Sequence, residues 1–257
     1  MPDKIEVEDK WDFYPCRVDN HPASMSVNMA YIDHAPISGA DTVYRLTFEQ
    51  PDPGEHGMGT QQSFDVMCDV EDAFFTHLSD SELYFVGRLR NMGKWELYFF
   101  GCGGQDRRIE DAAAKAIQQT TNLPYDFGSK PDPEWSGYTN YIYPSPERHR
   151  WMADRSVVDV LAEHNDLHNK PRRIDHWIYF AAKDDREAMA KAVAMIGFAR
   201  EDDPEDGDGD LPFGLQLYRD DPSELNHINS VTSRLCEIAD ENGGSYDGWE
   251  TFIVNDD

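Results

Sequence analysis

The sequence is short of basic residues, of cysteine and of long apolar runs. It holds 23 Lys and Arg against 50 Asp and Glu, a formal net charge of -27 at pH 7. Such a charge repels phosphates at long range, so we expect neither nucleic acid nor an anionic membrane as a direct partner. It permits a protein partner with a basic surface, although acidic runs more often only face water.

The four cysteines, at positions 16, 68, 102 and 236, are scattered and form no CxxC pair. This pattern is typical of reduced, mostly buried thiols in a cytosolic protein. No segment approaches the ~20 apolar residues that a membrane span needs. The first residues have neither the basic segment nor the apolar core of a secretion signal. We therefore expect a soluble, cytoplasmic protein.

The first half of the chain alternates between strand and helix patterns. Residues 24–32 and 42–49 alternate at period two, as half-buried strands do. Helical apolar stripes follow in 64–78 and 106–117, on either side of a predicted hairpin over 83–100. Residues 138–143 are predicted as the closing strand. From residue 42 the order is therefore strand, helix, strand, strand, helix, strand.

The second half repeats this order after a long predicted helix over residues 147–164. The predicted elements are a strand at 174–180, a helix at 184–196, paired strands at 198–201 and 213–219, a helix from 222 that a glycine at 243 or 244 ends, and a last strand at 249–254. We predict an α+β protein with two ferredoxin-like sandwiches. The predicted domains are 1–145 and 172–257, joined by a helix and loop over 146–171.

The stretch Tyr246-Asp247-Gly248-Trp249 is the most informative segment of the second half. Asp247 and Gly248 are predicted to form a tight corner between the last helix and the last strand. The two aromatic residues beside them either fill the core or face a partner. The sequence leaves both interpretations open, and we take Tyr246, Asp247 and Trp249 as candidate contact residues.

The densest charge run covers residues 201–210 and contains Asp206 and Asp208. A calcium loop is excluded because the twelfth position, counted from Asp202, is Phe213 instead of Glu. A solvated hairpin loop and an electrostatic contact for an arginine-rich partner both remain. The second interpretation makes Asp206 and Asp208 candidate partner-binding residues.

The sequence offers no case for catalysis, a metal or a cofactor. Residues 101–104 (GCGG) lie between a predicted strand and a helix, but their spacing matches no phosphate-binding motif. His164 and His168 are four residues apart and lack further ligands for zinc. The alternative functions are a small-molecule-binding or hydrolytic domain with a pocket near Gly101 to Gly104, and an immunity-type binding protein.

Residues 157–254 resemble the family of regulator of ribonuclease activity B, the protein inhibitor of ribonuclease E. The resemblance rests on YDGW at 246–249, on IDHWIYF at 174–180, on AMIGF at 194–198 and on the preceding acidic helix. It implies a non-catalytic protein that docks on a basic, largely disordered region of a ribonuclease E-like RNA-processing enzyme.

Residues 11–143 resemble family 695 of the domains of unknown function. The resemblance rests on WDFY at 11–14, PAS at 22–24, FVGR at 85–88 and the aromatic strand at 95–100. This family implies no activity. From the acidic charge and the resemblance of residues 157–254, we predict an acidic protein-interaction module that regulates a ribonuclease E-like enzyme.

Overall fold

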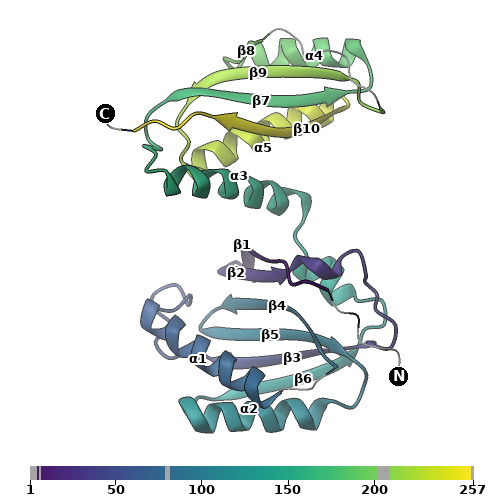
Figure 1. The fold of residues 1–257 in the computed structure, drawn as a ribbon, viewed down its shortest axis with the longest axis vertical. Helices are drawn as coiled ribbons and strands as arrows, with labels where there is room; N and C mark the ends of the chain where they lie inside the picture. Colours follow the sequence, from purple (N-terminus) through teal and green to yellow (C-terminus); the bar gives the residue numbers. More distant parts are fainter. Residues whose placement is uncertain (1–4, 6, 79–81, 202–208, 256–257) are drawn as a thin grey trace. The chain divides into compact units, whose positions relative to one another are not determined.

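The structure is a computed structural model that describes residues 5, 7–78, 82–201 and 209–255. The chain divides into two compact units, Met1–Ser145 and Pro146–Asp257. Each unit has one antiparallel sheet with helices packed on it (Figure 1). The predicted α+β class and the two sheets are confirmed.

The first unit is built on a six-stranded antiparallel sheet with the order β1-β2-β4-β5-β3-β6. Its strands are β1 (Trp11–Val18), β2 (His21–Asn28), β3 (Thr42–Glu49), β4 (Tyr84–Asn91), β5 (Lys94–Gly101) and β6 (Tyr125–Pro131). Its helices are the 3-10 helix η1 (Met29–Tyr31), α1 (Gln61–His77), α2 (Asp106–Thr120) and the π-helix η2 (Gly137–Ile142).

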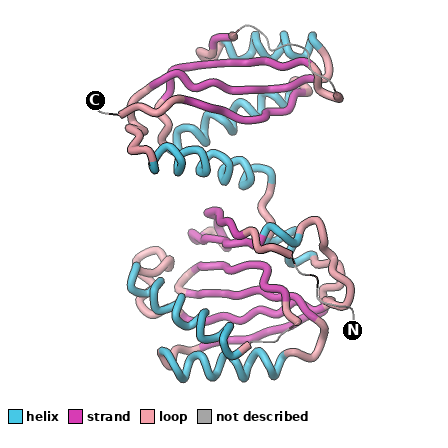
Figure 2. The backbone as a smooth tube through the Cα atoms, viewed as in Figure 1, coloured by secondary structure: helices cyan, strands magenta, loops and turns pink. Residues whose placement is uncertain are grey.

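Helices α1 and α2 cover one face of this sheet (Figure 2). Tyr44, Leu46 and Phe48 of β3 point to that face and join the buried side chains of both helices in one core. Because strand side chains alternate, Val43, Arg45 and Thr47 point to the other face. The period-two pattern of residues 42–49 therefore predicted this strand and its two faces correctly.

An aromatic segment, residues 135–142, covers part of that other face. Trp135 stacks on Phe100 with the ring centroids 4.2 Å apart, and the Tyr138 hydroxyl donates to the Asn28 carbonyl at 2.8 Å. The predicted closing strand at 138–143 is wrong, because these residues form the π-helix η2. Tyr138 and Ile142 are its buried side chains, and their spacing of four suits a helical turn.

The strand that closes the sheet is β6, which the sequence pattern did not reveal. It is an edge strand with mostly exposed or half-buried side chains, so it lacks the alternation of a half-buried strand. The other edge strand, β1, contains Pro15, which the sequence analysis did not place in a strand. Proline is tolerated there because an edge strand can leave a backbone position unpaired.

The second unit has a four-stranded antiparallel sheet with the order β10-β7-β9-β8. Its strands are β7 (Arg172–Phe180), β8 (Ala199–Arg200), β9 (Phe213–Asp221) and β10 (Gly244–Thr251). Its helices are α3 (Pro146–Glu163), α4 (Lys183–Ala194) and α5 (Leu225–Glu241). All three pack on the same face: α4 and α5 enclose Ile178 and Leu217, and α3 and α5 enclose Ile174 and Trp249.

All four cysteines are free thiols, of which only Cys236 is buried and the others are half-buried. The expectation that most of them are buried is therefore wrong. Over the residues that the structure describes, no helix is both long and apolar enough to cross a membrane.

Candidate functional site

The YDGW stretch lies inside strand β10 and does not form the predicted corner. Tyr246 pairs with Ile178, Gly248 pairs with Trp177, and Asp247 is the extra residue of a bulge between them. The turn lies earlier, at Gly243, whose φ of 67° ends helix α5 as the sequence predicted. An Asp-Gly pair suits a turn and a bulge equally, and the pairing with β7 decides between them.

Trp249 is part of the core, with 8% of its surface exposed. Its indole Nε1 donates to Asp154 Oδ1 on α3 at 2.9 Å. The other carboxylate oxygen accepts from Thr232 at 2.7 Å and from Asn229 at 2.9 Å, both on α5. Burial raises the pKa of Asp154, and the three hydrogen bonds oppose this rise. This network joins α3, α5 and β10.

Tyr246 also points to the helix-covered face, where its hydroxyl lies 2.9 Å from His176 Nδ1. Burial raises the pKa of Tyr246 and lowers the pKa of His176 to about 4. Among the described residues, His176 Nε2 is buried without a hydrogen-bond partner. The pair is therefore held neutral at pH 7.

Of the candidate contact residues, the structure exposes Asp247 and packs Tyr246 and Trp249 into the second unit. Asp206 and Asp208 lie outside the described residues. Their roles in partner binding stay predictions.

Side chains of the second sheet alternate between the helix-covered face and an open face that no helix covers among the described residues. Because Ile174, His176 and Ile178 point to the helices, the intervening residues of β7 point away from them. The register adds neighbours from β9, β10 and the residue after β8 to the same face. It carries half-buried aromatic rings and several carboxylates: Trp177, Tyr179, Tyr218, Asp175, Glu201, Asp220 and Glu250.

This open face already binds one guanidinium, that of Arg173. The group contacts both oxygens of Asp175, at 2.7 and 3.0 Å, and Glu201 Oε2 at 2.5 Å. It also lies over the Tyr218 ring, 4.0 Å from the centroid. These hydrogen bonds raise the pKa of Arg173. Paired carboxylates and an aromatic ring are the groups that recognise arginine.

Further space and charge remain beside this arrangement. A Cβ atom added at Gly248, opposite Trp177, would meet nothing within 4 Å. Within the described part of the chain, no hydrogen bond or ion pair engages the side-chain carboxylates of Asp220, Asp247 or Glu250. The alternation of residues 173–179 could have shown this face, but only the packing shows which side the helices leave open.

The glycine-rich turn and the two histidines that the sequence offered as candidates form local hydrogen bonds within the protein. The Tyr44 hydroxyl donates to the Cys102 carbonyl at 2.7 Å and accepts from Gln105 N at 3.2 Å, which fixes the glycine-rich turn to β3. His164 Nδ1 lies 2.8 Å from the Val160 carbonyl, and His168 Nδ1 lies 3.1 Å from Ser223 Oγ. The described residues contain no group of three or more side chains arranged to hold a metal ion.

The comparison with protein families assigns both halves of the chain. The family of unknown function DUF695 matches residues 9–143, more than half of the 257 residues. The chain belongs to this family. Regulator of ribonuclease activity B matches residues 151–251, which contain most of α3, the open face and the YDGW stretch. Both resemblances stated from the sequence are confirmed for this DUF695 member.

No curated protein matches the chain. A solved structure described as a "putative glycine cleavage system transcriptional repressor" matches at 8% identity with a TM-score of 0.25. The match covers 82% of this chain and 98% of that one. At this TM-score the likeness carries no argument about fold or function.

Proposed function

We propose that the chain is a non-catalytic regulator that binds a ribonuclease E-like RNA-processing enzyme through its second unit. The match of residues 151–251 to regulator of ribonuclease activity B carries this proposal. The family name supplies the class of target, and the net charge of -27 favours a basic protein surface over RNA itself.

The contact surface in this proposal is the open face of the second sheet. Arg173 lies between Asp175 and Glu201 on the Tyr218 ring, so an arginine of the partner would find the same chemistry at the neighbouring unpaired carboxylates and Trp177. Aromatic residues provide contact area, and the carboxylates attract a basic segment and speed its association.

The predicted residues take separate roles in this proposal. Asp247 contacts the partner directly, and Asp206 and Asp208 add electrostatic attraction. Tyr246 and Trp249 act from inside the unit, because they hold β10 and its bulge against the helices.

The architecture is proposed to be ferredoxin-like in both halves. In each, a strand-helix-strand-strand-helix-strand series gives the sheet order fourth, first, third, second, and the first unit adds β1 and β2 at an edge. We place domains at 1–145 and 172–257 with a linking segment at 146–171, and we place the protein in the cytoplasm without a cofactor.

An RNA-cleavage assay tests the proposal. The ribonuclease E-type enzyme of the source organism is incubated with a labelled RNA and increasing amounts of the full chain. The compared variants are Trp177→Ala, on the open face, and Trp11→Ala, a control with an exposed tryptophan in the first unit.

We expect the wild type and Trp11→Ala to slow cleavage equally and Trp177→Ala to lose the effect while it remains folded. A wild-type chain that leaves cleavage unchanged and does not bind the enzyme would refute the proposal. Equal inhibition by all three chains would refute the open face as the contact surface.

A further inference from the structure

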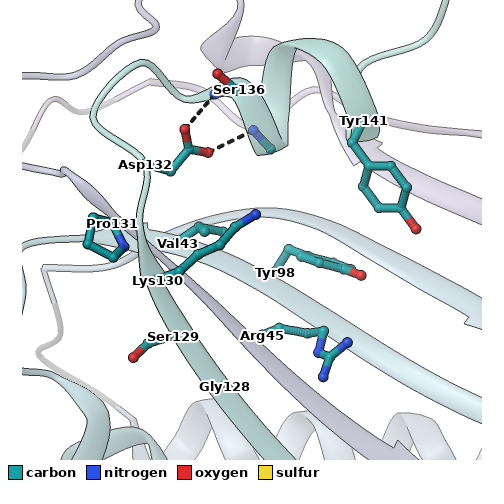
Figure 3. A pocket seen from close by; sticks show the side chains of 11 residues that line it. Val43, Arg45, Tyr98, Gly128, Ser129, Lys130, Pro131, Asp132, Ser136 and Tyr141 are labelled. Atoms are coloured by element: carbon teal, nitrogen blue, oxygen red, sulfur yellow. Dashed lines mark hydrogen bonds between the residues drawn. The ribbon is translucent and has the colours of Figure 1, made fainter.

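The first unit contains a pocket of about 670 Å³ on the sheet face opposite α1 and α2. It lies between β6 and the π-helix η2, where the aromatic segment leaves the sheet uncovered (Figure 3). Its volume is within the range of small-molecule sites. The predicted pocket near Gly101 to Gly104 is a different place, since none of these residues lines it.

Two cations lie in this pocket of a strongly acidic protein. Arg45 of β3 and Lys130 of β6 point to the same face, because Val43 pairs with Lys130 and Arg45 pairs with Gly128. In the described part of the chain, no hydrogen bond or ion pair engages the Lys130 ammonium. Arg45 forms an exposed ion pair with Asp126, 3.4 Å long, which a bound anion could replace.

Two carboxylates beside the pocket, those of Asp132 and Glu96, already accept hydrogen bonds from the protein. Asp132, which lines the pocket, accepts from Ser136 N at 2.9 Å and Gly137 N at 2.7 Å, and Figure 3 shows its carboxylate turned toward η2. Glu96 accepts from the Tyr98 hydroxyl at 2.5 Å. Arg45 and Lys130 therefore supply the cationic hydrogen-bond donors of the lining, while the oxygens of Asp132 are directed to backbone N–H groups.

Flat rings complete the lining. Tyr98 and Tyr141 lie with ring centroids 6.1 Å apart, and Figure 3 shows Tyr141 pointing from η2 toward the space beside Tyr98 and Arg45. Burial raises the pKa of both phenols, so they add no negative charge at neutral pH. Opposite Arg45, a Cβ atom at Gly128 would meet nothing within 4 Å, so the pocket is open there.

We propose that this pocket binds a small organic anion with a planar ring, whose carboxylate or phosphate lies between Arg45 and Lys130 and whose ring lies against Tyr98 and Tyr141. Charge-assisted hydrogen bonds would hold the anionic group, and the phenol faces would hold the ring. This site is independent of partner binding by the second unit.

Calorimetric titration of the full chain at physiological salt tests the proposal, since distant acidic residues are then largely screened. The probes are benzoate, phenyl phosphate and the neutral benzamide. The variants are Lys130→Met, which removes one cation, and Gly128→Val, which fills the pocket without changing its charge. Lys115→Met on α2 is the control, because Lys115 is an exposed lysine on the helix side.

We expect at least one anion to bind saturably and more tightly than benzamide, and the preferred anion to identify a carboxylate or phosphate ligand. Lys130→Met should weaken binding about tenfold, Gly128→Val should abolish it, and Lys115→Met should leave it unchanged. Thermal unfolding of each variant confirms that it is folded. The proposal would be overturned if neither anion bound saturably or if benzamide bound as tightly as the anions. It would also be overturned if Lys130→Met and Gly128→Val both bound the anion with the wild-type affinity.

Discussion

Replacing Trp249 separates its structural role from a role in direct contact. The indole is buried among Leu161, Ile174 and Ile228 and donates to Asp154 at 2.9 Å. Trp249→Ala removes this packing and should lower the free energy of unfolding of the second unit by about 3–5 kcal/mol. Trp249→Phe keeps a ring but removes a donor to a buried carboxylate, which should cost about 1.5–3 kcal/mol.

Guanidinium unfolding followed by circular dichroism and tryptophan fluorescence measures these losses. Because the chain has two compact units, the curves are fitted with two transitions, and only that of the second unit should move. The control is Trp11→Phe, at an exposed position in the first unit. Its free energy of unfolding should differ from that of the wild type by no more than about 0.5 kcal/mol.

An unfolding curve of Trp249→Ala that superimposes on that of the wild type would refute this reasoning. If the variant also failed to bind the partner, Trp249 would have to be a direct contact residue. Partner binding by folded Trp249→Phe at the wild-type affinity would instead agree with the structural role.

Three further outcomes follow from the second unit. The pKa of His176 is lowered from 6.5 to about 4, so its stability contribution is complete above pH 6.5 and is lost as the pH falls toward 4. Unfolding measured across this range should show a loss of about 3 kcal/mol, and a His176→Leu profile parallel to that of the wild type would contradict this. A Cβ at Gly244 would lie 2.3 Å from the Phe180 ring, so Gly244→Ala should destabilise the unit by about 1–3 kcal/mol. A Cβ at Gly248 would meet nothing within 4 Å, so Gly248→Ala should leave the melting temperature nearly unchanged. Equal melting temperatures of the two variants would refute the packing argument. In stopped-flow association with the ribonuclease, Glu250→Lys should slow the on-rate at low salt and Glu110→Lys on α2 should not, and equal slowing would point to total charge instead of the open face.

Regular periodicity predicted the central elements of both sheets. Residues 42–49 and 174–180 alternate because each strand has one face in a core, and α5 has an apolar stripe that packs on its sheet. The edge strand β6 buries too few side chains to alternate, so no comparable pattern marks it in the sequence. Residues 138–143 have strand-forming residue types, but the hydrogen bonds from Ser136 N and Gly137 N to Asp132 and the packing of Trp135 stabilise a helical turn there.

The sites depend on contacts between residues that are distant in the sequence. YDGW was recognisable as a motif, yet its burial depends on Asp154 from α3, and its bulge depends on pairing with β7. The open face requires knowledge of which side the helices cover. The pocket in the first unit combines β3, β5, β6 and η2, so no local pattern could predict it.

The binding affinity of the full chain for the ribonuclease E-type enzyme, compared with that of Gly248→Thr, tests the central claim most directly. Threonine suits a strand, and its side chain would occupy the open space opposite Trp177 without removing any charge. The account predicts a folded variant with wild-type stability that has lost most of its affinity, while the control Gly128→Val in the first unit binds normally. Undiminished binding by Gly248→Thr, or no binding by the wild type, would contradict it.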